Sequence, residues 1–321
     1  MIRHSAVKLL YVGMVVAVAL SACAAEEPRD EPGIEARRAA RAAQTIRLVY
    51  PDWSSEVAGA HLIQAVLQER LGYRVQLMQT DAEGMWRMVA DGEADVLAGA
   101  WLPVTHDEYF RDYGGRLEDL GPNLQGARIG LVVPTATPGR QTEDTGRTGR
   151  DLVTIRSIDE LADHADRFEG RIIGIESGAG VMARAQEALE VYGLERSFRL
   201  IESDEERMIA EVNDAIRNLR WVVFTGWTPH WSFERHNMRF LDDPQAVFGG
   251  VEAIHTMTRT GFAEDMPDAY ATLRRMEWEP RQLERLMIWI HDDSTGDVYR
   301  QALRWIRTHS DLVDEWVRDI E

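Results

Sequence analysis

Strand-like and helix-like segments alternate along this chain from Thr45 onwards, and that alternation restricts its fold more than any other feature. Residues 46–50 and 73–78 are short runs typical of strands, and residues 57–67 between them are apolar at helical spacing. A second helical pattern and an apolar run at 95–98 repeat the order. This order predicts a parallel sheet, and ligands of such sheets bind beyond the carboxyl ends of the strands.

The second half of the chain continues the alternation and then returns to the first lobe. Strand character is found at 127–134, 171–176, 221–224 and 251–258, and helical character at 181–192, 206–216 and from 268 to the end. Ser157 is expected to cap a helix, and residues 135–150 are expected to form a flexible crossover because they lack an apolar period. The chain thus crosses between lobes twice, which predicts a hinged, two-lobed α/β protein.

One short sequence motif, a tryptophan followed two residues later by a proline, occurs twice after an apolar run. Ala100-Trp101-Leu102-Pro103 and Gly226-Trp227-Thr228-Pro229 each follow an apolar run, and the proline forbids regular continuation of a strand. We therefore expect each strand to end at its tryptophan, which would face the crevice at the edge of the sheet. Trp53 lies at the same edge because it follows the first predicted strand. Each ring can hold a cation at about 0.5–2 kcal/mol without a hydrogen bond, so these residues indicate a site for a quaternary ammonium ligand.

A glycine-bearing turn, Ser177-Gly178-Ala179-Gly180, lies between a predicted strand and a predicted helix. Backbone N–H groups at the start of a helix, together with the helix dipole, can bind a carboxylate. An ordinary strand–helix turn would use the same glycines, so the turn alone leaves both interpretations open.

The amino terminus has the pattern of an export signal. Arg3, His4 and Lys8 precede an apolar run at 9–20, which is too short for a comfortable membrane span, and Leu20-Ser21-Ala22-Cys23 ends it. These four residues resemble a bacterial lipobox, and Cys23 is the only cysteine of the chain. We therefore expect a signal peptide at 1–22, lipidation of Cys23 and a polar tether at 23–44. A plain secretory leader with an incidental cysteine is the alternative.

The composition excludes some partners. The formal charge of -18 repels nucleic acid and anionic lipid, so neither is an expected partner. Lys8 is the only lysine, which fits either a salt-adapted host or a GC-rich genome.

Several enzyme classes lack their signatures. The sequence contains no G-x-S-x-G elbow, no Cys/His cluster and no phosphate-binding G-x-x-x-x-G-K segment. We therefore expect no catalytic residue, no metal site and no cofactor.

Four segments in order resemble the glycine betaine-binding proteins of ABC transporters. They are Tyr50-Pro51-Asp52-Trp53-Ser54-Ser55-Glu56, Ala100-Trp101-Leu102-Pro103-Val104-Thr105-His106, Ile173-Gly174-Ile175-Glu176-Ser177-Gly178-Ala179-Gly180-Val181-Met182 and Thr225-Gly226-Trp227-Thr228-Pro229-His230-Trp231. The segment 252–262 also looks like the return segment of that family. The resemblance covers about residues 46–316, which is essentially the whole mature domain.

The resemblance implies a two-lobed periplasmic-binding-protein fold, similar to type II, with ligand in the cleft between lobes. Residues 45–133 and 252–321 are expected to form one lobe, and residues 134–251 the other. The family site implies a cation cage of Trp53, Trp101 and Trp227, and carboxylate capture by the N–H groups of Gly180 and Val181 with help from His106.

The same resemblance implies a partner and a place. We expect a lipid-anchored extracytoplasmic monomer, periplasmic in a host that has a periplasm, which delivers glycine betaine to the permease of an ABC importer. Choline, proline betaine and carnitine are alternative ligands, and a ligand sensor for a signalling receptor is the alternative role. An enzyme acting on betaine comes third.

Three side chains near the motifs have a second interpretation. His106 could merely cap the turn after Pro103, and Trp231 is expected to pack behind Trp227. Asp52 is expected to cap the following helix; if it reached the site instead, choline would become a more plausible ligand.

Overall fold

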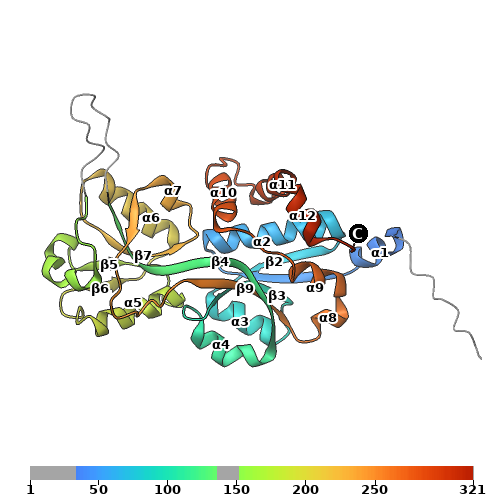
Figure 1. The fold of residues 1–321 in the computed structure, drawn as a ribbon, viewed down its shortest axis with the longest axis horizontal. Coiled ribbons are helices and arrows are strands. Elements are labelled where there is room, and N and C mark those ends of the chain that lie inside the picture. Colours follow the sequence, from blue (N-terminus) through green and yellow to red (C-terminus); the bar gives the residue numbers. More distant parts are fainter. Residues whose placement is uncertain (1–33, 136–151, 321) are drawn as a thin grey trace, which may run out of the picture.

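A computed structural model describes residues 34–135 and 152–320 of the chain. Figure 1 shows an elongated α/β molecule with two lobes, joined by the long strand β4 (Leu117–Pro134) and by the chain that leads into β9 (Glu252–Arg259). The predicted fold class is confirmed.

The first lobe is built on a mixed sheet with the order β2-β1-β3-β9-β4. Strand β1 (Thr45–Tyr50) runs parallel to β2 (Arg74–Gln79) and β3 (Val96–Leu102), as the alternation predicts, whereas β9 returns antiparallel to β3. Helices lie on both faces (Figure 1). Their bounds are α2 (Ser54–Val66), continued by a π-turn (Leu67–Leu71), α3 (Ala82–Ala90), α4 (Asp107–Tyr113), α8 (Phe262–Asp265), α9 (Pro267–Leu273), α10 (Pro280–His291), α11 (Val298–Thr308) and α12 (Ser310–Trp316), with a 3-10 turn at Gly114–Arg116.

The second lobe is built on the end of β4. Residues 128–132 of β4 pair with β7 (Val223–Thr228), which is followed in the sheet by β5 (Arg171–Ile173) and β6 (Arg199–Ile201). The short strand β8 (Met238–Phe240) pairs with the other side of β4. The helices are α5 (Gly180–Val191), α6 (Glu205–Arg217) and α7 (Ser232–Arg235), preceded by 3-10 turns at Ile158–Glu160 and Ala162–Phe168.

The strand β4 changes partner where the chain passes between lobes. Its residues 117–127 pair with β9 and its residues 128–132 pair with β7. The first crossover therefore lies a few residues before the predicted boundary at 133/134, and the second lies between β8 and the start of β9 at Glu252. The exact lobe boundaries stay a prediction.

Several local predictions differ from the structure. The strands do not end at the tryptophans, because Trp101 lies inside β3 and Trp227 inside β7, each followed by one more strand residue. Hydrogen bonds to neighbouring strands continue through both residues, so the prolines end the strands slightly later than predicted. The first half of β4 and the short strands β6 and β8 were not predicted.

Two further predictions concern loops. Ser157 does cap the next element, in a capping box with Glu160, but that element is a 3-10 turn rather than an α-helix. The predicted flexible crossover lies mostly outside the described residues, as do the signal peptide and Cys23.

The end of the predicted tether forms helix α1 (Ile34–Ala42), which packs against the first lobe. The buried Arg41 guanidinium donates to the carboxylate of Asp268 at 2.7 Å and to the carbonyl oxygen of Ile320 at 2.8 Å. Residues 34–42 are therefore part of the folded body.

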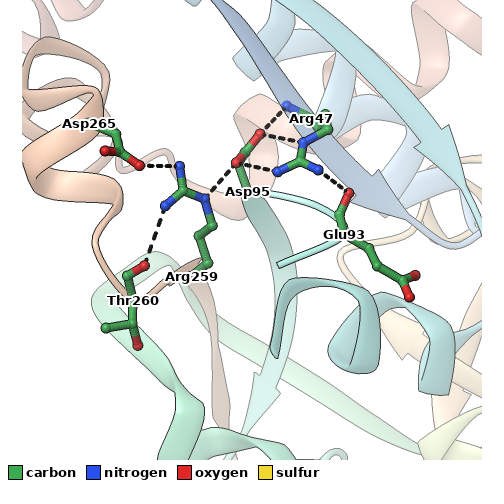
Figure 2. A network of polar contacts seen from close by, with 6 residues as sticks. All are labelled: Arg47, Glu93, Asp95, Arg259, Thr260 and Asp265. Carbon is green, nitrogen blue, oxygen red and sulfur yellow. Dashed lines mark hydrogen bonds and ion pairs between the residues drawn. The ribbon is translucent and has the colours of Figure 1, made fainter. Parts of the chain in front are cut away.

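A buried carboxylate ties three strands of the first lobe together (Figure 2). Asp95, 2% exposed, accepts hydrogen bonds from the Arg47 guanidinium on β1 at 2.9–3.0 Å and from Arg259 on β9 at 2.7 Å. Arg259 also pairs with the exposed Asp265 at 2.6 Å. Burial alone would raise the pKa of Asp95, but the hydrogen bonds from Arg47 and Arg259 outweigh it and lower that pKa.

Candidate ligand-binding site

A small cavity lies between the two lobes. Both lobes contribute side chains, which are mostly apolar or aromatic. The lining residues are Trp53, Trp101, Thr105, Ile129, Ile175, Ala179, Gly180, Val181 and Trp227. Five of the six ligand-contacting residues predicted from the sequence are therefore brought together; His106 is not among the lining residues.

Trp53 enters the cavity from the start of α2. It is the residue before the first helical turn, with extended backbone (φ -105°, ψ 142°), and it is 7% exposed. Its indole nitrogen donates a hydrogen bond to Glu176, which belongs to the second lobe. The ring that should contact a ligand is thus fixed by a residue across the cleft.

Trp101 enters from β3 and is fixed within the first lobe. Its indole nitrogen donates to Glu56 at 2.8 Å. Glu56 is 5% exposed, and burial raises the pKa of its carboxyl to about 7. Gly99 leaves the room for this carboxyl, since a Cβ at that position would lie 2.5 Å from Glu56 Oε2.

Trp227 enters from the second lobe, on β7, opposite Ile129 of β4 in the sheet register. Unlike the other two rings, its indole nitrogen has no hydrogen-bond partner within the described part of the chain. The His230 ring contacts it edge-on, with 4.9 Å between the ring centroids.

The amino end of α5 lines part of the cavity through Ala179, Gly180 and Val181. Ala179 caps the helix with extended backbone, and Met182 and Ala183 donate to its carbonyl oxygen. The N–H groups of Gly180 and Val181 lie in the first turn, where a helix supplies no carbonyl partner. The helix dipole adds positive potential there, so this end of the cavity suits an anion.

Thr105 lies directly against this helix end. A Cβ on Gly180 would overlap the Thr105 carbonyl oxygen, so only glycine allows this approach. The Thr105 turn is held by the buried Glu252, whose carboxylate accepts from the N–H groups of Val104 at 2.6 Å and Thr105 at 2.8 Å.

His106 lies behind the cavity, 1% exposed, with its ring centroid 6.1 Å from that of Trp53. Burial lowers the pKa of its imidazole to about 3, so the ring is neutral. Its Nδ1 accepts a hydrogen bond from the N–H of Trp101 at 3.2 Å. Within the described residues its Nε2 has no hydrogen-bond partner.

Direct contacts between the lobes surround the cavity. Ser54 N–H, in the first lobe, donates to Glu205 of the second lobe at 2.9 Å, and its hydroxyl donates to the same carboxylate. Asp107 pairs with Arg184 of the second lobe at 2.8 Å. The structure therefore represents a closed arrangement of the lobes.

None of the described residues that line the cavity carries a titratable side chain. Among residues 34–135 and 152–320, no cluster of three or more His, Cys, Asp or Glu side chains is placed to hold a metal ion. No helix in these ranges is both long and apolar enough to cross a membrane.

A comparison with protein families identifies the chain. The family described as the substrate binding domain of ABC-type glycine betaine transport systems matches residues 44–308. The chain belongs to this family.

Two relatives of this binding domain carry names that refer to betaine binding. The glycine betaine/carnitine transport binding protein GbuC of Listeria monocytogenes is 34% identical over 169 residues, which cover 52% of this chain and 56% of that protein. The alignment thus spans a little over half the length of that relative. The glycine betaine/proline betaine-binding periplasmic protein of Escherichia coli K12 is 21% identical over 277 residues, covering 78% of this chain and 82% of that protein.

Solved structures of related binding domains have the same fold. Lactococcal OpuAC, closed around glycine betaine, matches with a TM-score of 0.77 at 33% identity, over 86% of this chain and all of that one. A choline binding protein in complex with choline matches with a TM-score of 0.74, over 87% and 92% of the two chains, but at 23% identity it supports the fold alone.

Some residues around the site of this binding domain escaped the sequence analysis. Glu56 and Glu176 lay inside the recognised segments but had no assigned role, and Glu252 lay at a strand start. The only local feature of the sequence that could have indicated a role for them is that each carboxylate lies within three residues of a tryptophan or of a glycine-bearing segment. Trp231 stacks on His291 of the first lobe, with 3.7 Å between centroids, and does not line the cavity.

Proposed function

We propose that this protein captures glycine betaine outside the cytoplasm and delivers it to an ABC importer. The observation that carries the proposal is the meeting of Trp53, Trp101 and Trp227 with the start of α5 around one cavity. A trimethylammonium group cannot donate a hydrogen bond, and stacked indole faces are the protein surface best suited to hold it.

The ligand carboxylate would bind at the other end of the cavity. The N–H groups of Gly180 and Val181 are its proposed donors, supported by the dipole of α5. The Nε2 of His106 is proposed as an additional contact for the carboxylate, because it has no hydrogen-bond partner among the described residues.

Closure would couple binding to transport. Trp53 and Trp101 come from the first lobe, and Trp227 and the start of α5 come from the second, so ligand favours the closed arrangement that completes both halves of the site. The permease would recognise that closed shape. In this proposal the protein works as a monomer, anchored to the membrane surface by a lipid on Cys23.

Calorimetric titration with glycine betaine, proline betaine, carnitine and choline tests the proposed ligand. Betaine should bind more tightly than choline, which lacks the carboxylate. Equal affinities would remove the carboxylate site, and no binding of any of the four compounds would refute the proposal. Recovery of unchanged ligand by mass spectrometry distinguishes binding from turnover.

A further inference from the structure

The Glu56 carboxyl lies directly behind one ring of the cavity. Glu56 is in the first turn of α2, and its Oε1 accepts the indole N–H of Trp101 at 2.8 Å. Its Oε2 fills the space that Gly99 leaves open on β3. The carboxyl is thus held between helix and strand, with the Trp101 ring between it and the cavity.

The three rings of the cavity differ in what lies at their indole nitrogens. Trp53 is bonded to Glu176, which is half-buried and also lines an open groove, so solvent screens its charge. Trp227 has no partner at this nitrogen among the described residues. Glu56 is therefore the buried carboxyl of the set, and a charge there acts through low-dielectric surroundings.

Glu56 has no basic partner in its surroundings. None of the ion pairs found between described residues involves it, and its other hydrogen bond is a long one from the Ser55 hydroxyl at 3.4 Å. A buried carboxylate without a counter-ion is costly. A cation held against the Trp101 ring would supply the missing counter-charge.

We propose that the Glu56 carboxylate is a positioning and specificity-determining group, which orients the Trp101 ring and attracts the ligand's cation through it. The inference rests on the proposed function. It assigns to Glu56 a preference for onium ligands over neutral molecules of the same shape. The negative charge of the Glu56 carboxylate, which accepts the indole N–H of Trp101, and the positive charge of the ligand attract each other. Each charge therefore stabilises the other.

Among Glu56 and the two titratable groups near it, Glu205 and His106, only Glu56 has its pKa near neutral pH. Burial is the main reason that its pKa is raised to about 7, and the charge of Glu205 on α6 raises it further. Glu205 itself is held ionised: burial would raise its pKa, but the adjacent His230 and the two hydrogen bonds from Ser54 lower it. His106, in the turn after β3, stays neutral because its pKa is about 3.

The proposal predicts linkage between ligand and protons. A bound cation favours the ionised form of Glu56, so binding lowers its pKa and releases protons near neutral pH. Two unit charges about one indole ring apart should shift that pKa by about one unit, which corresponds to about tenfold in affinity. Betaine affinity should therefore rise about tenfold from about pH 5 to about pH 8, with a release of about half a proton near pH 6.5.

Calorimetry of betaine binding in two buffers of different ionisation enthalpy measures this release directly. In Glu56→Gln, which keeps an acceptor for Trp101 but not the charge, affinity at about pH 8 should fall about tenfold. The release and the pH dependence should both disappear. Glu108→Gln, the same change on the exposed surface of α4, should behave like the wild type.

Each outcome distinguishes the inference from the proposed function. Absence of betaine binding to the wild type refutes the function. Normal binding without proton release, or release that persists in Glu56→Gln, overturns the role of Glu56 and leaves the function intact. If Glu56→Gln does not fold, carboxyl carbon NMR of the wild type with and without betaine decides: an unchanged Glu56 pKa overturns the inference.

Discussion

The hydroxyl of Tyr109 donates a hydrogen bond of 2.7 Å to the carbonyl oxygen of Gly178, and this bond joins the two lobes beside the cavity. Tyr109 lies on α4 of the first lobe, and Gly178 lies in the turn that leads into α5 of the second. Because this bond spans the two lobes, we expect it to break when they open and therefore to stabilise the closed state that would hold the ligand.

Removal of this bond should weaken ligand binding modestly. Tyr109→Phe loses one neutral hydrogen bond, worth about 1 kcal/mol, which corresponds to about fivefold in affinity. Tyr113→Phe is a matched control, because Tyr113 is on the same helix but bonds Glu83 within the first lobe. Calorimetry should find a weaker Kd for Tyr109→Phe alone; equal values for the two variants would contradict the proposed contribution to closure.

A single methyl group at Gly180 should prevent closure. Gly180→Ala places a Cβ against the Thr105 carbonyl oxygen, whereas Gly178→Ala meets only the Tyr109 hydroxyl at an ordinary 3.9 Å. We expect betaine affinity to fall at least about tenfold in Gly180→Ala and to change little in Gly178→Ala. Small-angle scattering with saturating betaine should find the first variant more open, and a normal closed profile would refute the close approach.

Each ring of the proposed cage should matter separately. Trp53→Ala, Trp101→Ala and Trp227→Ala should each weaken betaine binding by at least tenfold, equivalent to about 1.4 kcal/mol. Trp289→Ala serves as control, because that half-buried ring contacts Arg304 on α11, outside the cavity. Unchanged calorimetric affinity in all three cage variants would exclude the cage.

The buried Asp95 should stabilise the first lobe. Asp95→Asn leaves Arg47 and Arg259 without their shared carboxylate, so the free energy of unfolding should fall by about 1.5–3 kcal/mol, the range for hydrogen bonds to charged groups. Asp265→Asn removes an exposed partner of Arg259 and should cost less than about 1 kcal/mol. Chemical denaturation at pH 7 measures both, and equal losses would contradict the importance of burial.

The same carboxylate gives an expected pH dependence. Its folded-state pKa lies below its unfolded value, so its contribution is complete above about pH 4 and is lost as the pH falls through the folded pKa. The stability difference between wild type and Asp95→Asn should therefore shrink on acidification. If the stability difference between wild type and Asp95→Asn stayed constant down to about pH 2, the charge of Asp95 would not be the source of its stabilising contribution.

The sequence determined the local elements and the edge on which the site lies. The spacing of apolar residues and the positions of glycines predicted β1, α2, β2 and α3 in order. These patterns are local, because the spacing of apolar residues shows which face of a helix or strand is buried. The topology then placed Trp53 and Trp101 at one edge of a sheet.

Only the tertiary structure decided which distant groups meet. Glu56 bonds Trp101 from 45 residues away, and Glu205 bonds Ser54 from 151 residues away. No local pattern encodes these contacts, since they depend on how helix, strand and lobe pack together. For the same reason the sequence singled out Gly180 as a member of a tight turn, whereas the closed lobes explain why it has to be glycine.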